Sequence, residues 1–291
     1  MVPVAASGGV TISCPLNGRY AFYNSPYPAH RLMTGIDIYI NSIIDESMSS
    51  PVDGEILQVR QVKAPIGNGF KAPNFDVVTI IRSSENPERV IKVLHIETRM
   101  RVGESIEVGH RLGPFIRSGY FGYQTPLHAH IEIRPLNDPL RVRGGYPIDS
   151  LLELDGLDLT EEIIGTVTAS RPGYALIKLS LKTPGIVVDV GGVPGILDGG
   201  IPLYGWFGVH AENPMKDTSI KLLGKTIGKT TDIQPRTCVA ECNDFRLMIE
   251  STPVDAFFML LPNGEPTITV TSRMRDELGL ELNAEISLTV E

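Results

Sequence analysis

The stretch LHAHIEIRP, residues 127–135, contains two histidines one residue apart inside an apolar run. In a β-strand, alternate side chains point to opposite faces, so His128, His130 and Glu132 would share one face. The opposite face would carry only apolar side chains, which predicts that this face packs in the hydrophobic core. Two imidazoles at successive positions on one face indicate a chemical site or an unusually polar exterior.

The same half of the chain contains other groups that can bind a metal ion or transfer a proton, and all lie between residues 30 and 130: His30, Asp37, His95, His128 and His130. Catalytic zinc takes three ligands from His, Asp, Glu or Cys and leaves one position for water. That water becomes a nucleophile near neutral pH, and a nearby His or Glu commonly serves as the base. The set is compatible with a hydrolytic zinc site, and also with histidines scattered over solvated strand faces.

Several short motifs follow one another in the first half of the chain: Gly35-Ile36-Asp37, the turn SPVDGEI, the single His95 in VLHIE, the glycine series RVGESIEVGHRLG, and His128-Ala129-His130. In this order they resemble the lysostaphin-type (LytM-like) zinc metallopeptidase family. The resemblance covers roughly residues 10–140. The C-terminal half matches no family pattern that we recognise.

The resemblance implies roles for four of these residues. Asp37 and His130 would be zinc ligands. His95 and His128 would lie over the metal, where they orient or deprotonate the water and stabilise the tetrahedral intermediate. Glu132 could orient a ligand from the same strand face, although a surface carboxylate is the simpler interpretation.

The sequence departs from the family pattern at three places. The pattern has a histidine ligand where this chain has Met33, and methionine is a poor zinc ligand among hard partners. The nearest histidine, His30, follows a proline-rich segment and is the expected replacement. Val93 stands where many members have a tyrosine, which would weaken oxyanion stabilisation. A polar segment, residues 41–50, is the third departure.

Three functions remain open at this point. The first is a zinc-dependent endopeptidase that hydrolyses a peptide bond with a metal-activated water, on a peptide or a peptidoglycan-like substrate. The second is a non-catalytic LytM-like scaffold that binds a partner. The third is a carbohydrate- or peptide-binding β protein whose histidines are incidental. The metal content of the purified protein would distinguish the first from the others.

The elements that must position these residues are mainly β-strands. Runs of Val, Ile and Thr are broken by Gly and Pro at short intervals, which predicts antiparallel sheets of the barrel or sandwich type. The acidic segment at residues 151–162 predicts a boundary between a metallopeptidase-like domain, residues 1–155, and a second β-rich domain, residues 156–291. Short helices are expected at residues 41–48 and 147–154, and residues 271–280 are ambiguous between helix and strand.

The second half shows no comparable site. Cys238 and Cys242 are four residues apart with only His210 nearby, and a zinc site would need further ligands, so ordinary buried thiols are expected. Trp206 and Phe207 are expected to be a core pair. We interpret this domain as an accessory module for partner binding, substrate positioning or oligomerisation, and the sequence does not distinguish these roles.

Composition excludes some classes of function. The chain has 291 residues, a formal net charge of −8 and a pI of about 5.3, which disfavours nucleic acid and anionic membranes as partners. No apolar run is long enough for a membrane span. Three cysteines make no disulfide framework and no secretory signal is evident, so we expect a cytoplasmic location.

Overall fold

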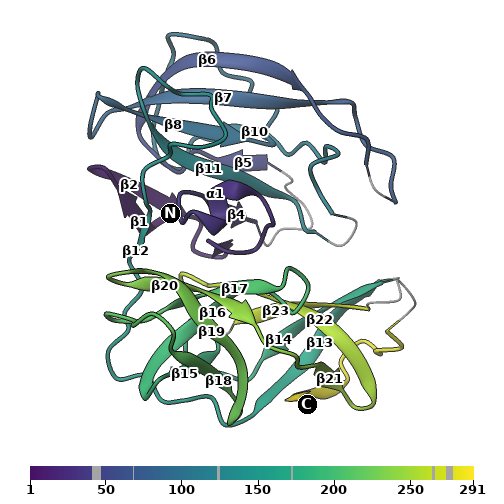
Figure 1. The fold of residues 1–291 in the computed structure, drawn as a ribbon. Helices are drawn as coiled ribbons and strands as arrows, with labels where there is room; N and C mark the ends of the chain where they lie inside the picture. The colour runs from purple at the N-terminus through teal and green to yellow at the C-terminus, as the bar shows by residue number, and fades with distance from the viewer. Residues whose placement is uncertain (41–46, 68, 123–124, 172, 264–265, 273–277) are drawn as a thin grey trace. The chain divides into compact units, whose positions relative to one another are not determined.

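The computed structural model describes the chain except for residues 41–46, 68, 123–124, 172, 264–265 and 273–277, and it is built almost entirely of antiparallel β-strands (Figure 1). Within the described residues the one α-helix is α1 (Pro28–Arg31). The predicted mainly β, antiparallel fold class is therefore confirmed. No helix in these ranges is long and apolar enough to cross a membrane.

Of the two predicted short helices, one lies mostly outside the described residues and the other is absent. Most of residues 41–48 lies outside the described residues, as does most of the polar segment 41–50. Residues 147–154 are not helical, so that prediction is wrong: they contain β12 (Asp149–Ser150), which pairs with β1 (Val2–Ser7). Pairing with a distant strand overrode the local helical pattern here.

The chain divides into two compact units. Unit 1 comprises Met1–Tyr20 and Tyr27–Leu151, and unit 2 comprises Ala21–Pro26 and Leu152–Glu291. The main division falls at the start of the acidic segment 151–162. The sequence did not indicate that residues 21–26 would belong with the second half.

In unit 1, a seven-stranded antiparallel sheet contains most of the sequence motifs. Its strand order is β3-β4-β11-β8-β7-β6-β9, with β3 (Arg19–Ala21), β4 (Ile36–Tyr39), β6 (Gly54–Lys63), β7 (Phe75–Ser83), β8 (Arg89–Leu94), β9 (Ser105–Ile106) and β11 (His128–Pro135). A second sheet has the order β12-β1-β2, with β2 (Val10–Cys14), and β5 (Ser47–Ser49) pairs with β10 (Arg111–Pro114).

Strand β11 lies inside this sheet, between β4 and β8, and both of its faces are buried. The apolar side chains Ala129, Ile131 and Ile133 are fully buried, as expected for the core face. The polar side chains that alternate with them are buried too, so the alternative of a solvated exterior is wrong. Buried polar groups must be paired to be tolerated, and on this strand their partners build the site described below.

The described residues of unit 2 form twelve strands whose pairings close two six-stranded circuits. One circuit is formed by β13 (Ile163–Arg171), β14 (Tyr174–Leu179), β21 (Leu247–Ile249), β22 (Thr252–Phe258), β23 (Thr267–Ser272) and β24 (Glu285–Val290). The other is formed by β15 (Val187–Val190), β16 (Val193–Ile201), β17 (Trp206–His210), β18 (Ser219–Leu222), β19 (Lys225–Gln234) and β20 (Thr237–Cys242). β16 also pairs with β22 and so joins the two circuits.

Residues 21–26 are anchored in unit 2 by specific contacts. The Phe22 amide donates to Asp198 Oδ2 at 2.7 Å, and the Tyr23 hydroxyl lies 2.6 Å from Thr237 Oγ1. The Tyr23 ring fits only because position 208 is glycine, since a Cβ on Gly208 would lie 1.8 Å from the ring. The chain re-enters unit 1 at Tyr27, immediately before α1.

Candidate metal centre

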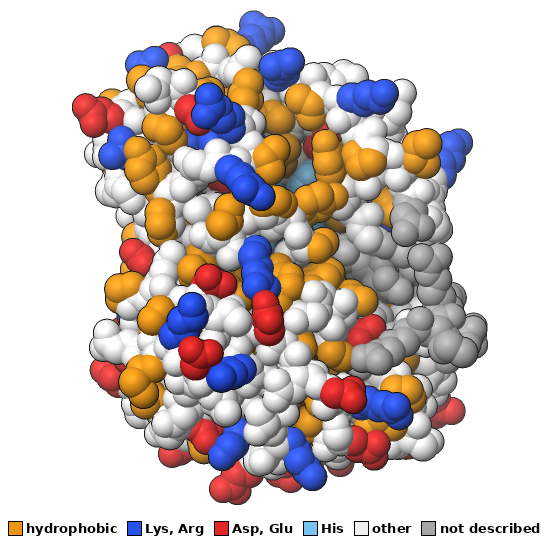
Figure 2. Space-filling view, viewed as in Figure 1, with side chains coloured by type: hydrophobic (Ala, Val, Ile, Leu, Met, Phe, Trp, Pro, Cys, Tyr) orange, Lys and Arg blue, Asp and Glu red, His pale blue; other side chains and the backbone are white. Residues whose placement is uncertain are grey.

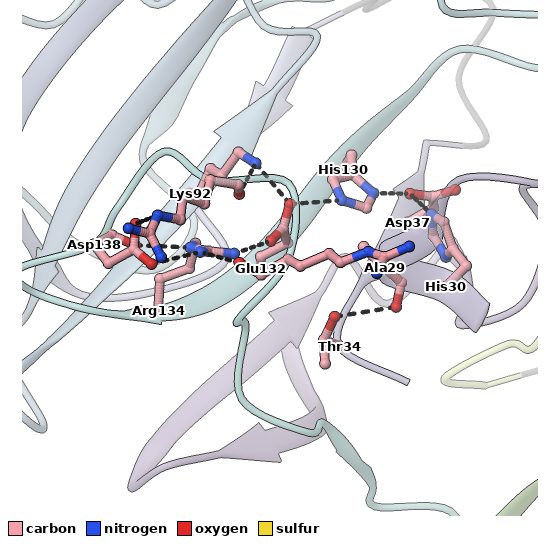
Figure 3. A network of polar contacts seen from close by, with 11 residues as sticks. Ala29, His30, Thr34, Asp37, Lys92, His130, Glu132, Arg134 and Asp138 are labelled. Atoms are coloured by element: carbon pink, nitrogen blue, oxygen red, sulfur yellow. Dashed lines mark hydrogen bonds and ion pairs between the residues drawn. The ribbon is translucent and has the colours of Figure 1, made fainter. Parts of the chain in front are cut away.

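Three side chains from separate elements converge in unit 1. His30 Nε2 lies 3.3 Å from Asp37 Oδ1, and His130 Nδ1 lies 2.9 Å from the same oxygen. The three residues can each present one ligand atom such that all three atoms lie within 4.8 Å of one another. Figure 3 shows both imidazoles directed at the Asp37 carboxylate. The structure thus brings together the three residues expected to be metal ligands.

The local sequence explains this convergence. β4 and β11 pair antiparallel with Asp37 opposite His130, so that the two side chains project from the same face of the sheet. His30 comes from α1, where Pro28 occupies the first turn, a position that proline favours. The expected proline-rich loop at His30 is therefore a short helical turn.

Gly35 makes room for the centre. A Cβ at this position would lie 2.7 Å from His130 Cε1 and 3.1 Å from the Ala29 Cβ. A side chain here would push the imidazole away from Asp37 or shift α1. Glycine in the Gly-x-Asp motif is thus required by the close packing of the ligands against the turn.

We expect Gly35→Ala to weaken zinc binding about tenfold, because displacing a ligand by a few tenths of an ångström has the effect of losing a supporting contact. The added methyl should also destabilise unit 1 by about 1–3 kcal/mol through overpacking. Competition with a chromophoric chelator measures the first effect and urea unfolding the second. Unchanged zinc affinity would contradict the assigned role of Gly35.

The electrostatics of Asp37 favour a cation. Burial by itself would raise the pKa of this carboxyl, but the charges of His128 and His30 and the hydrogen bonds from His130 and His30 hold it well below its ordinary value. Its Oδ2 atom is buried and has no hydrogen-bond partner within the described residues. Two imidazole nitrogens and one carboxylate form a donor set typical of zinc. The residues present therefore fit a zinc ion.

His130 is held on its other side by Glu132. Its Nε2 lies 3.4 Å from Glu132 Oε1, which leaves Nδ1 facing Asp37. Burial alone would lower the pKa of His130, but Asp37 and Glu132 together raise it to about 9. A carboxylate behind a ligating imidazole fixes its orientation and increases its basicity.

Glu132 is almost fully buried, which corrects the interpretation of a surface carboxylate. Lys92 Nζ and Arg134 Nη1 each lie 2.8 Å from its carboxylate oxygens. Burial would raise the pKa of Glu132, but His130 and Lys92 lower it to about 2. Figure 3 shows the resulting chain of charges leading from Asp37 through His130 to Arg134. Sequence analysis placed Glu132 on the correct face and could not identify its cationic partners.

His128 lies on the other side of Asp37. Its Nδ1 donates to the Pro126 carbonyl at 2.9 Å, and its Nε2 lies 3.5 Å from Asp37 Oδ2. Burial lowers the pKa of His128 to about 4, although Asp37 opposes this change. Because a carbonyl can only accept a hydrogen bond, the proton of the neutral ring is on Nδ1 and the lone pair of Nε2 faces the centre.

His95 approaches the same place from the end of β8. Its ring centroid is 5.5 Å from that of His128 and 6.5 Å from that of His130. The residue has φ +71°, a left-handed conformation that non-glycine residues rarely adopt and that is concentrated at functional sites. Phe121 packs against both His95 and His128. Figure 2 shows histidine atoms at the bottom of a hollow bordered by hydrophobic side chains.

Asp76 orients His95, and sequence analysis missed it. Its Oδ2 lies 2.5 Å from His95 Nδ1 and accepts a hydrogen bond from Ser118 Oγ, while its Oδ1 accepts from the His95 amide. Burial would raise the pKa of Asp76, but His95 and Ser118 keep it below its ordinary value. Asp76 belongs to no motif, so only its fully buried position in β7 reveals it.

Two of the departures from the family pattern, Met33 and Val93, are buried apolar residues. Met33 is buried and has φ +59°, in the turn between α1 and β4. Val93 is fully buried and pairs with Ile131, on the sheet face opposite His130. His110 is 61 % exposed, beside Glu107.

The thiols of unit 2 behave as expected for buried cysteines. Cys238 is fully buried and Cys242 partly so, and burial raises the pKa of each to about 12. Neither joins a metal-binding group within the described residues. Trp206 and Phe207 are both buried, as predicted for core aromatics.

Comparisons with known proteins give one family match and one solved structure. Residues 13–150, just under half of the chain, match the family described as "Domain of unknown function (DUF8155) N-terminal domain". A comparison with curated proteins found no match. Among solved structures, the antimicrobial peptidase lysostaphin from Staphylococcus simulans aligns over 94 % of this chain and 98 % of its own, with 13 % identity and a TM-score of 0.30. A TM-score this low does not establish a shared fold.

Proposed function

We propose that the protein is a zinc-dependent endopeptidase. The observation that supports this most is the buried group of His30, Asp37 and His130, whose ligand atoms lie within 4.8 Å of one another, with two further histidines beside it. A zinc ion held by this group would lower the pKa of a coordinated water and polarise a scissile carbonyl.

The two flanking histidines are suited to different tasks. His95 Nδ1–H donates a hydrogen bond to Asp76, which leaves Nε2 free to take a proton from the attacking water. The Asp76 carboxylate can then stabilise the imidazolium that forms. His128 has only a neutral carbonyl behind it, and its pKa of about 4 keeps Nε2 unprotonated. We infer that His128 orients the water by accepting a hydrogen bond and that His95 moves the proton.

The test combines metal content with peptide hydrolysis. Purified protein is analysed for zinc by mass spectrometry and then incubated with pentaglycine and with a peptidoglycan cross-bridge peptide, with and without 1,10-phenanthroline. About one zinc per chain and hydrolysis that the chelator abolishes would support the proposal. His95→Ala and His128→Ala should each lose hydrolysis and retain zinc, while His110→Ala should retain both.

The same experiment decides between the alternatives. Bound zinc without hydrolysis of either peptide would favour the non-catalytic scaffold, in which the centre stabilises a surface for a partner. Absence of zinc under all loading conditions would contradict the endopeptidase, and would leave either a metal-free scaffold or a binding protein whose histidines are incidental.

Zinc affinity should rise with pH. In the metal-free protein the pKa of His130 is raised to about 9, so the ring is protonated at neutral pH and must release its proton to bind a metal. One proton released per ion predicts about a tenfold gain in affinity per pH unit between pH 6 and 8. Chelator competition at several pH values measures the slope, and a flat profile would mean that His130 is already neutral in the metal-free protein.

A further inference from the structure

Two tyrosine rings lead from the flanking histidines of the centre to the surface. The Tyr120 ring centroid lies 6.1 Å from that of His95, and the Tyr27 ring centroid lies 5.8 Å from that of Tyr120. Tyr27 is 42 % exposed and Tyr120 is half-buried, so solvent reaches both. Phe121 packs against His95 and His128. We call Tyr27, Tyr120 and Phe121 the aromatic row.

The aromatic row lies at the edge of the centre. Tyr27 is the residue immediately before α1, which supplies His30, and Tyr120 is beside His95, which moves the proton in the proposed reaction. Successive residues of an extended peptide are about 3.3 Å apart. A substrate side chain that adjoins the scissile bond therefore lies within reach of the row.

The Tyr120 ring is held in place by the packing of its own backbone. A Cβ on Gly119 would overlap the Pro65 carbonyl oxygen, and the Tyr120 hydroxyl donates to the Lys63 carbonyl at 3.4 Å. Both contacts fix the segment that carries Tyr120 against the connection between β6 and β7. A side chain that is already fixed loses little conformational entropy when a ligand packs against it.

The polar groups along the row are bonded to backbone carbonyls. The Tyr27 hydroxyl donates to the Tyr120 carbonyl at 3.1 Å. The guanidinium of Arg117 lies 5.7 Å from the Phe121 ring centroid and donates to two backbone carbonyls in the loop that follows Phe121. The row therefore presents a ligand with ring surface rather than with charge. Figure 2 agrees, because hydrophobic side chains border the hollow in which the histidines lie.

We propose that the aromatic row is a substrate subsite that takes a large apolar side chain adjoining the scissile bond. The choice of a peptide rests on the proposed function. A leucine or phenylalanine side chain packed against the rings removes apolar area from water, which stabilises the complex. A glycine at this position leaves the rings exposed, and a charged side chain loses hydration without gaining a partner. The subsite thus selects a bulky apolar residue over an all-glycine bridge.

The test measures peptide binding to the zinc-free, full-length protein, so that the result does not depend on whether the protein hydrolyses peptides. Calorimetry compares four N-acetylated peptide amides: tetraglycine, and Gly-Gly-X-Gly in which X is leucine, phenylalanine or glutamate. Chitotriose is titrated as a fifth ligand to represent a sugar. The proteins are wild type, Tyr27→Ala, Tyr27→Phe and the matched control Tyr146→Ala, which removes a half-buried tyrosine that packs on Arg89.

We expect wild type and Tyr146→Ala to bind the leucine or the phenylalanine peptide at least about tenfold more tightly than tetraglycine. Tyr27→Ala should reduce this preference to about threefold or less, because the exposed end of the row is lost. Tyr27→Phe should retain most of the preference, because the ring rather than its hydroxyl contacts the ligand.

Three results would overturn the subsite. Equal affinity of wild type for tetraglycine and for both apolar peptides would do so without any variant. Tighter binding of the glutamate peptide or of chitotriose than of both apolar peptides would assign the row to another chemistry. An undiminished preference in Tyr27→Ala would place the apolar side chain elsewhere. Failure of hydrolysis alone leaves these binding results intact and contradicts only the proposed peptidase function.

Discussion

Replacing His30 with alanine is expected to lower zinc affinity by at least about tenfold, the scale of even a lost supporting contact at a metal site. The change leaves Asp37 and His130 as the only two ligands of the group, and zinc sites of this kind need three. Peptide hydrolysis should be lost with the metal. Dialysis against a zinc buffer followed by elemental analysis measures the effect.

Two controls accompany this prediction. His110→Ala removes an exposed histidine of the same unit and should leave zinc binding unchanged. Met33→Ala alters the position where the family pattern has its ligand and should also retain zinc, although its positive φ leaves some strain. Full zinc occupancy in His30→Ala, or loss of zinc only in Met33→Ala, would refute the ligand role of His30.

Asp76→Asn is expected to reduce kcat for peptide hydrolysis by a factor of about 100 or more, within the range for loss of a positioned acid–base group. The asparagine side chain carries no negative charge, so it accepts a weaker hydrogen bond from His95 Nδ1. It can also turn its NH₂ group, a donor, toward the imidazole. The imidazole would then adopt the wrong tautomer or turn away. Zinc content should not change, because Asp76 contacts no residue of the metal-binding group among its described hydrogen bonds.

A purely structural role for Asp76 predicts a different outcome. If the carboxylate only stabilised the fold, Asp76→Asn would lower the unfolding midpoint and leave the pH–rate profile of the remaining activity unchanged. A positioning role instead predicts a shift of the limb of that profile that reports His95. Asp149→Asn, an exposed carboxylate in β12, is the matched control and should alter neither kcat nor the profile.

The sequence alone was sufficient for part of this site. The strict alternation in residues 127–135 predicts which side chains share a face, because a strand has a period of two and burial of one face sets its register. The resemblance to the lysostaphin-type family, which rests on the order of motifs, then implied that Asp37 and His130 would meet, and β4 and β11 do pair with these residues opposite each other. Their roles in catalysis remain predictions.

The tertiary structure determined which side chains orient and neutralise the histidines and carboxylates of the site. Asp76 meets His95 only because β7 and β8 are neighbours in the sheet, and a single aspartate at the start of a strand has no sequence signal. The same holds for Lys92, which stands outside every motif and meets Glu132 because β8 and β11 are neighbours in the sheet. Pairings between distant segments carry no local periodicity, so the sequence could not reveal them.

The path of the chain through unit 2 also depended on long-range packing. Residues 21–26 have the composition of an ordinary loop, yet Tyr23 occupies a space that exists only because Gly208, far along the chain, has no side chain. The all-β class and the polar face of β11 could be predicted from residue types and spacing, and the set of His30, Asp37 and His130 from the resemblance to the lysostaphin-type family. The residues that orient and neutralise the side chains of this site were determined by which strands lie side by side in the sheet.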